Sequence, residues 1–178
     1  DPDHSLVGSE MCIRDRSNTS PKGSVLPALD PLQTTLGVAN ASFVAQTADW
    51  VPAHLYATLQ AGFEHPGFSF IRILQRCPKF TPDVFIDQVK NPDLTELLVH
   101  ENGVDVPGLD RLFKARREHD PKDIHTAREL VSKTDMLRLG IFFRDDSMPV
   151  YDEVRAVPPV TAEEKVQKLE KEFDRYAV

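Results

Sequence analysis

The alternation of helix and strand signals between residues 30 and 75 constrains the fold of this chain more than any other stretch. Asp30 is a favourable helix cap and Pro31 a favourable first helical residue, so a helix is expected to begin there. The run FSFIRILQ is rich in aromatic and β-branched residues, which are typical of strands. The expected elements are a helix over 31–39, a strand over 42–46, a helix beginning near Pro52 and a strand over 68–75. Helices and strands that alternate at this spacing predict an α/β fold with a parallel sheet and flanking helices.

The same region predicts which side chains are buried. The second helix carries an apolar face made of Leu55, Leu59, Gly62 and Phe63. The strand over 68–75 is dense in apolar residues, and this density fits a strand that is buried on both faces of a sheet.

The rest of the chain is less regular. The expected elements are a short helical stretch within 81–93, a strand and turn over 97–103, a helix over 124–133, a strand over 139–146, an extended proline-rich connector over 148–160 and a terminal helix over 161–176. The charged run KARRE at 114–118 is interpreted as the solvated face of a helix.

The terminal helix has the clearest local signals in the second half of the chain. Thr161 and Glu164 have the spacing of a capping box, which satisfies backbone N–H groups at a helix start. Its apolar stripe consists of Val166, Leu169, Phe173 and Tyr176. We expect this helix to pack either on the body of the protein or on a partner.

Composition excludes several classes of protein. The chain has 178 residues, 40% of them hydrophobic and 28% charged, which suits one globular domain or part of a larger one. The formal net charge of −7 argues against a nucleic-acid surface, which needs clustered Lys and Arg. No apolar run approaches the roughly 20 residues that span a bilayer, and no apolar signal segment is found near the start. With only two cysteines, we expect a reducing, cytoplasmic location.

No catalytic motif stands out. GxGxxG, GxxxxGK, HExxH, GxSxG and CxxC are all absent from the sequence. The ligand-type residues His119, Asp120, Asp123 and His125 are interpreted as a solvated loop, and His54 and His65 as structural or surface residues. Trp50 is expected to anchor the start of the second helix in the core.

Cys77 is open to two interpretations. A single cysteine after a buried strand is most often an inert core residue. However, it follows the carboxyl end of a predicted strand, where ligands bind in open α/β sheets. It lies between Arg76 and Lys79, with Pro78 fixing the turn, and cationic neighbours favour a thiolate over a thiol.

Residues 1–16 differ from the rest of the chain because they show no helix or strand period. The string SLVGSEMCIRDR resembles a translated sequencing-library adapter. We therefore interpret residues 1–16 as an artefactual, disordered segment and exclude Cys12 from any site.

Several segments, in order, resemble a known family. The strings SPKGS, DPLQTTLGVANASFVAQ, HLYATLQAGFEHPGFSFIRILQRCPKF and LGIFFRDDSMPVYDE are similar to the beta subunit of 2-oxoacid:ferredoxin oxidoreductases, which bind thiamine diphosphate. The resemblance implies that residues 17–80 are the C-terminal half of a thiamine-diphosphate-binding domain. Residues 81–178 then form the C-terminal region of the beta subunit, with an extended tail and a terminal helix.

The resemblance also implies an activity. The family oxidatively decarboxylates a 2-oxoacid to an acyl-CoA and passes the electrons to ferredoxin, and 2-oxoglutarate is favoured here over pyruvate. Thiamine diphosphate, Mg²⁺, a [4Fe–4S] cluster, coenzyme A and an alpha subunit are the implied cofactors, substrate and partner. Two alternatives stay open: a thiamine-diphosphate-dependent decarboxylase or synthase without a cluster, and a non-catalytic docking subunit.

Two residues are implied as site residues by the resemblance. Cys77 matches the family's fourth cluster ligand, and Ser20 matches the end of a loop beside thiamine diphosphate, although Lys22 replaces the usual Thr. The family's GDGD segment, its following Asn-rich turn and three further cluster cysteines are not in this sequence. We therefore expect this fragment alone neither to bind thiamine diphosphate fully nor to assemble the cluster, and to be inactive.

Overall fold

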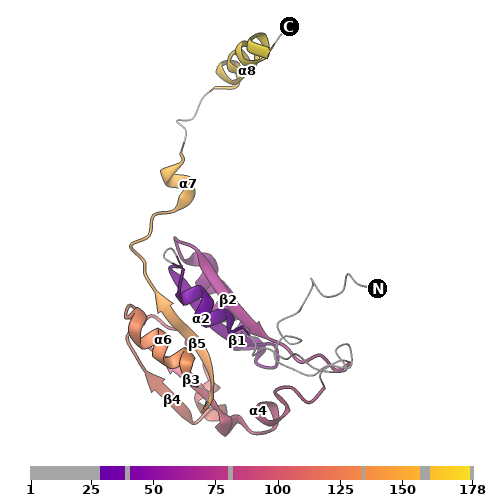
Figure 1. Cartoon of the computed structure of the whole chain (residues 1–178), viewed down its shortest axis with the longest axis vertical. Helices are drawn as coiled ribbons and strands as arrows, with labels where there is room; N and C mark the ends of the chain where they lie inside the picture. The colour runs from indigo at the N-terminus through magenta and orange to yellow at the C-terminus, as the bar shows by residue number, and fades with distance from the viewer. Residues whose placement is uncertain (1–28, 39–40, 80–81, 134, 157–160, 177–178) are drawn as a thin grey trace. The chain divides into compact units, whose positions relative to one another are not determined.

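The structure is a computed structural model that describes residues 29–38, 41–79, 82–133, 135–156 and 161–176 (Figure 1). These residues form two units, a larger one that ends at Met148 and a smaller one that begins at Pro149. Ser20 and residues 1–16 lie outside the described residues.

The larger unit contains most of the secondary structure. Its elements are α2 (Pro31–Leu36), β1 (Phe43–Ala48), α3 (Pro52–Glu64), β2 (Ser69–Leu74), α4 (Ile86–Lys90), η2 (Pro92–Leu94), β3 (Thr95–Val99), α5 (Leu109–Leu112), β4 (Ala115–Glu118), α6 (Ile124–Ser132) and β5 (Leu137–Arg144). The smaller unit contains α7 (Tyr151–Val154) and α8 (Ala162–Tyr176).

The five strands form one mostly parallel sheet in the order β2-β1-β5-β3-β4. β1 and β2 are parallel to each other, as are β3, β4 and β5, but β5 runs antiparallel to β1. The α/β fold class is confirmed, and the expectation of an all-parallel sheet is corrected at this one pairing. As a consequence, the carboxyl ends of β1 and β2 lie at one end of the sheet, and those of β3, β4 and β5 lie at the other.

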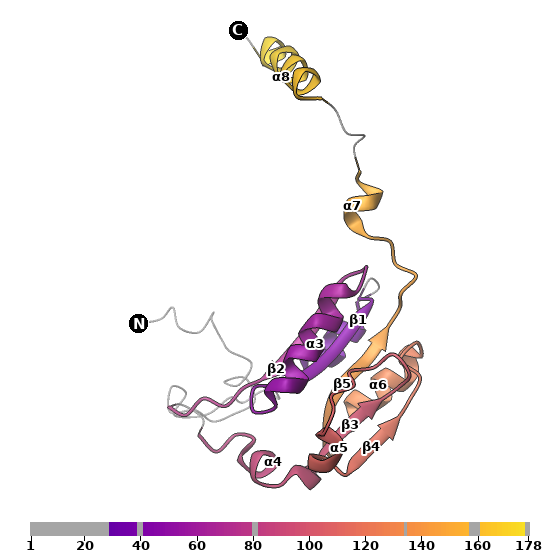
Figure 2. The same ribbon diagram turned by 180° about the vertical axis from the view of Figure 1, so that it is seen from behind.

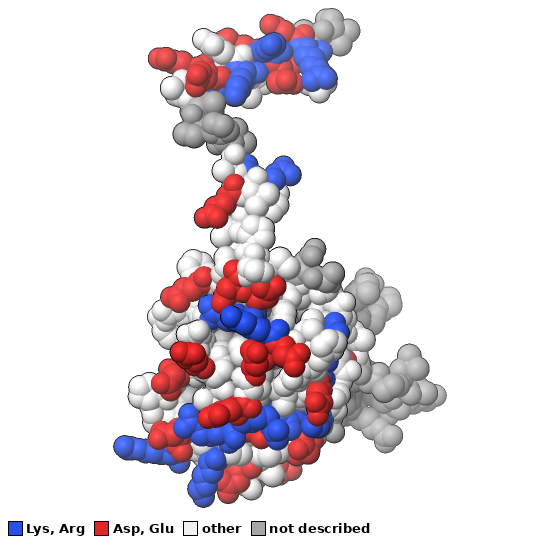
Figure 3. Space-filling view, turned by 90° about the vertical axis from the view of Figure 1, so that its left-hand side faces the viewer, with Lys and Arg blue, Asp and Glu red and all other residues white. Residues whose placement is uncertain are grey.

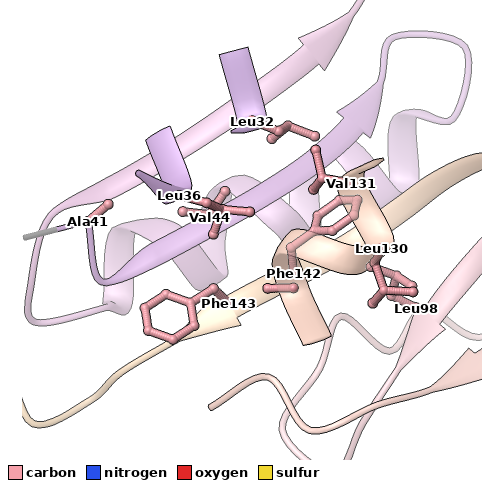
Figure 4. Packing of buried hydrophobic residues seen from close by; sticks show 10 residues of the cluster. Leu32, Leu36, Ala41, Val44, Leu98, Leu130, Val131, Phe142 and Phe143 are labelled. Carbon is pink, nitrogen blue, oxygen red and sulfur yellow. The ribbon is translucent and has the colours of Figure 1, made fainter. Parts of the chain in front are cut away.

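Helices cover both faces of the sheet. α2 and α6 lie on one face (Figure 1), and α3 lies on the other (Figure 2). Each face of the sheet has its own cluster of buried side chains. Alternate residues of β1 belong to the two clusters, because successive side chains of a strand point to opposite faces. Val44 belongs to the cluster that packs under α2 and α6 (Figure 4), whereas Phe43 and Ala45 belong to the cluster on the α3 side.

The local signals at α2 are confirmed. The Asp30 carboxylate accepts hydrogen bonds from the backbone N–H groups of Leu32 at 2.9 Å and Gln33 at 3.2 Å, as a helix cap does. The helix ends at Leu36, earlier than expected, because Gly37 caps it.

The apolar face predicted for α3 is only partly right, because Gly62 is buried and Leu55 half-buried but the other two predicted residues are not. The buried residues of this helix are His54, Thr58 and Gly62, whereas Leu59 and Phe63 are exposed. Small and hydrogen-bonded side chains let the helix approach the sheet closely, and a Cβ at Gly62 would lie 2.6 Å from Ile71 Cδ1. Close packing therefore decides this face, against the hydrophobic pattern.

Two strand predictions also need correction. β2 lies at the edge of the sheet and is only partly buried, with Ile73 45% exposed, so it is not covered on both faces. The KARRE run forms β4 at the opposite edge, where its side chains alternate between half-buried and exposed. An edge strand with charged residues is a common protection against pairing with other chains.

The later helices agree with the predictions, whereas the connector between them agrees only in part. α6 and α8 confirm the expected helices, and the capping box is formed, with Thr161 N donating to Glu164 Oε2 at 2.8 Å. The connector predicted as extended contains the short helix α7, and residues 157–160 of it are outside the described residues. The division predicted at residue 80 stays a prediction, and the sheet takes strands from both sides of it. Among the described residues, no helix is both long and apolar enough to cross a membrane.

Candidate functional site

Cys77 lies in the turn that follows β2, at the carboxyl ends of β1 and β2. Its side chain is half-buried, and the neighbouring Pro78 and Lys79 are exposed. Within the described residues, no group of three or more His, Cys, Asp or Glu side chains could hold a metal ion. A [4Fe–4S] cluster needs four ligands, of which the single thiolate of Cys77 could supply one.

Aromatic side chains pack at the same end of the sheet. The indole of Trp50 packs against Phe85, with ring centroids 5.5 Å apart, beside the cluster that contains Val51 and Leu74. The expectation that Trp50 anchors the start of α3 agrees with this packing. Its indole N–H has no hydrogen-bond partner among the described residues.

A buried ion network lies beside these residues and was missed by the sequence analysis. Glu96 Oε2 accepts hydrogen bonds from Arg138 Nε at 2.8 Å and from Arg117 Nε at 2.9 Å. Arg138 also donates to the carbonyl groups of Leu130 and Lys133 at the end of α6. The network joins β3, β4, β5 and α6, and its role is therefore structural.

A cavity of about 870 Å³ opens at the carboxyl ends of β3, β4 and β5. Ligands of open α/β sheets bind at this kind of position. The segments that follow the three strands line it with His100, Asn102, His119, Lys122, Arg144 and Asp146, together with acidic residues. Positive and negative side chains thus alternate around one opening, and this cavity is the candidate binding site of the larger unit.

Two histidines meet at the wall of the cavity. The rings of His100 and His119 pack edge to face with their centroids 5.6 Å apart. His119 Nε2 donates to the carbonyl oxygen of Phe142 at 3.3 Å, which leaves its Nδ1 as an acceptor. His119 Nδ1 and His100 Nε2 have no hydrogen-bond partner among the described residues.

Both histidines are neutral near pH 7. Burial lowers the pKa of His100 to about 4, and the charge of His119, when that ring is protonated, and the charge of Arg144 act in the same direction. Burial also lowers the pKa of His119, although its hydrogen bond to the Phe142 carbonyl acts in the opposite direction. Two neutral imidazoles can accept hydrogen bonds or a proton from a bound ligand.

A Ser–His–Asp arrangement closes one side of this region. His65 Nδ1 lies 3.3 Å from Asp146 Oδ1, and His65 Nε2 lies 2.9 Å from the Ser42 hydroxyl. Arg144 Nε donates to the same Asp146 oxygen at 2.8 Å. Burial raises the pKa of Asp146, but the hydrogen bond and charge of Arg144 outweigh this effect, so the pKa is below its ordinary value.

This arrangement is not a catalytic triad. Ser42 is 0% exposed, and its hydroxyl also contacts the carbonyl oxygen of Phe68 at 3.2 Å, so no substrate can reach it as a nucleophile. The three residues instead join the loops before β1 and β2 to the segment after β5. The structural interpretation of His65 agrees with these contacts, as does that of His54, which is buried against Thr47 and Thr58.

The residues predicted to form one solvated loop, His119, Asp120, Asp123 and His125, lie in two different environments in the structure. Asp123 caps α6 by accepting a hydrogen bond from the backbone N–H of His125 at 2.9 Å. His119 is half-buried and lines the cavity, so its interpretation as a solvated loop residue is wrong. Its position directly after β4 was the missed signal, because this segment was not recognised as a strand.

The fold is shared with a class of oxidoreductase. A solved structure of 2-oxoglutarate:ferredoxin oxidoreductase from Magnetococcus marinus, with 2-oxoglutarate, coenzyme A and succinyl-CoA bound, is similar to this chain with a TM-score of 0.59 and 21% sequence identity. The likeness covers 88% of this chain and 49% of that chain, so this chain spans about half the length of that protein. A search of curated proteins finds no match.

A family model gives the more specific match. Residues 109–157 match the model of the C-terminal part of the pyruvate ferredoxin oxidoreductase beta subunit. The matched segment contains β4, α6 and β5, and it supplies most of the residues that line the cavity. The resemblance to a beta subunit noted in the sequence is therefore confirmed, and its strongest support comes from the second half of the chain.

Proposed function

We propose that this chain is the C-terminal part of the beta subunit of a 2-oxoacid:ferredoxin oxidoreductase. The family match over residues 109–157 carries this proposal, and the shared fold supports it. The full-length protein, together with its alpha subunit, converts a 2-oxoacid and coenzyme A to an acyl-CoA and reduces ferredoxin. The name of the similar structure favours 2-oxoglutarate over pyruvate as the substrate.

The described residues play a supporting role in this activity. Thiamine diphosphate and a [4Fe–4S] cluster supply the decarboxylation and electron-transfer chemistry in the full-length complex. The part of the chain that the structure describes has no three-ligand metal group, so no catalytic step is assigned to its residues. Its contribution is a rigid sheet that positions Cys77 at one end and the cavity at the other.

Cys77 is proposed as one ligand of the [4Fe–4S] cluster. Its place in a turn at the carboxyl ends of two parallel strands supports this role, as does its half-buried side chain. The other ligands must then come from a part of the full-length protein that this chain does not contain, because a cluster needs four. Ser20, as a contact of thiamine diphosphate, remains a proposal based on the resemblance alone.

The test compares the iron content of the full-length protein with and without the Cys77 thiol. We expect Cys77→Ala to lose at least half of the cluster iron and to change the electron paramagnetic resonance signal of the reduced cluster. Gln75→Ala, a change of an exposed, uncharged residue in the same turn that keeps the thiol, should leave both unchanged. Iron content that is equal in all three proteins would favour the docking subunit. A full-length protein without iron would favour the decarboxylase.

A further inference from the structure

The smaller unit ends in a helix whose apolar stripe is not covered by the described residues of that unit. Val166, Leu169, Phe173 and Tyr176 lie on α8 and are 52%, 58%, 73% and 75% exposed. Most other residues of α8 are charged, and the face of the helix seen in Figure 3 shows basic and acidic side chains interspersed. Large apolar side chains that share one stripe of an exposed helix mark a surface that binds another molecule.

The spacing of the apolar residues in the stripe indicates the kind of partner that fits it. Val166 and Phe173 take the a positions of a heptad repeat, and Leu169 and Tyr176 take the d positions, with Ala162 one heptad before Leu169. A stripe restricted to a and d is a narrow seam that suits one other helix. Among parallel coiled coils, a β-branched residue at a with Leu at d, as at Val166 and Leu169, favours two strands.

The charges beside the seam fit a second copy of the same helix. Lys165 takes a g position and Glu170 the following e position. In a parallel pair, g of one helix faces e of the other, so Lys165 meets Glu170 of the second copy, and two-fold symmetry repeats this pair. Neither side chain takes part in an ion pair within the described part of its own chain, where Glu172 and Arg175 form the pair on α8.

The antiparallel arrangement is less favourable. There, e faces e, so Glu163 would meet Glu170 of the second copy, and symmetry would repeat this like-charge contact. On the other side g faces g, where Lys165 would meet Glu172, so attraction and repulsion would offset each other. The parallel arrangement has the attractive pairs without the repulsive ones.

From the seam and these charges, we propose that α8 pairs with α8 of a second copy of this chain as a parallel two-stranded coiled coil. The capping box of Thr161 and Glu164 stabilises the start of the helix in each copy.

Sedimentation equilibrium of the 178-residue chain tests the pairing. We expect a mass that rises with concentration from 20.0 kDa to twice that value. Leu169→Asp places a charge in the seam and should leave a monomer at every concentration. Circular dichroism should show that the larger unit remains folded in this variant, because the described residues of the buried clusters all belong to the larger unit itself.

Charge reversal distinguishes a specific coiled coil from non-specific hydrophobic association. Lys165→Glu and Glu170→Lys each create two like-charge pairs in the parallel dimer, and each should raise the dissociation constant about tenfold. The double variant, or an equal mixture of the two single variants, should restore the original constant. Lys171→Glu, the same charge change on the far side of the helix at an f position, should have no effect.

Three results would overturn the proposal. The first is a chain that stays monomeric throughout the concentration range. The second is a dimer that Leu169→Asp does not dissociate, which would place the contact elsewhere. The third is a dimer strengthened by Glu170→Lys alone, because this change relieves the repulsion in an antiparallel pair.

Discussion

Among the individual residues, Glu96 shows how strongly a buried charge depends on its partners. Its side chain is 7% exposed and lies between two guanidinium groups, of which that of Arg138 is 2% exposed. Burying a charge costs several kcal/mol, which only a well-placed opposite charge and hydrogen bonds offset. The network is therefore a point at which one substitution has a large effect.

Glu96→Gln should lower the free energy of unfolding by about 3 kcal/mol, because it leaves the buried Arg138 with only the exposed carboxylate of Asp135 as an opposite charge. Asp135→Asn removes the other carboxylate that contacts Arg138, at 2.6 Å, but Asp135 is 61% exposed and the change should cost less than about 1 kcal/mol. Urea unfolding followed by circular dichroism measures both values. If both variants lower the free energy of unfolding by the same amount, the burial of Glu96 does not increase the cost of removing its charge.

The buried imidazole of His54 makes the free energy of unfolding depend on pH. Burial lowers its pKa to about 4, whereas in the unfolded chain it has an ordinary pKa of about 6.5. Between these values the unfolded state binds a proton that the folded state does not, so stability falls as the pH drops from about 6.5 to 4. The full contribution, of about 3 kcal/mol, is present above pH 6.5 and lost below pH 4.

The comparison of this chain with His54→Asn isolates that contribution, because other histidines titrate in the same range. The free energy of unfolding of the variant should depend less steeply on pH between 4 and 6.5. Parallel curves for the two proteins would contradict the buried, neutral state of His54.

At the level of helices and strands, the sequence predicts the order of elements better than their burial. The helices capped by Asp30 and Thr161 were found because capping is local. On the buried face of α3, Gly62 was predicted but His54 and Thr58 were not, since this face is set by the close approach of the helix to the sheet. β4 was missed because Arg116 and Arg117 are atypical of buried strands and suit an edge.

The candidate site likewise contains one feature that could be predicted from the sequence and one that could not. Cys77 could be singled out from its place after an apolar strand and from a resemblance. The cavity could not, because it requires the carboxyl ends of β3, β4 and β5 to meet. That meeting depends on strand order, which includes the antiparallel pairing of β5 with β1. A single sequence gives no direct signal for such a pairing.

The contact between β3 and β5 gives a prediction of its own. Gly140 has a φ of +133°, and a Cβ there would lie 2.9 Å from Leu98 Cβ and 3.0 Å from the Leu98 carbonyl oxygen. Gly140→Ala combines backbone strain with a steric clash and should cost about 2–3 kcal/mol. Gly108→Ala has a similar strain, at φ +89°, but no atom lies within 4 Å of the added methyl group.

Thermal unfolding of both variants separates the two effects. We expect Gly108→Ala to cost about 1 kcal/mol, since it carries the strain alone. A Gly140→Ala variant as stable as Gly108→Ala would mean that β3 and β5 are not in close contact.

At the scale of the whole molecule, the main feature is the five-stranded sheet of the larger unit, which carries a candidate site at each of its two ends. One end presents Cys77, and the other presents the cavity and its neutral histidines. The segment that matches the beta subunit family builds most of the second end. This chain spans about half of the similar oxidoreductase, so its activity has to be measured in the full-length protein.

The most direct test of the proposed function is ferredoxin reduction by the full-length protein together with its alpha subunit. The account predicts reduction that requires both coenzyme A and a 2-oxoacid, and that is faster with 2-oxoglutarate than with pyruvate. If 2-oxoacids are decarboxylated without coenzyme A and ferredoxin stays oxidised, the account is contradicted.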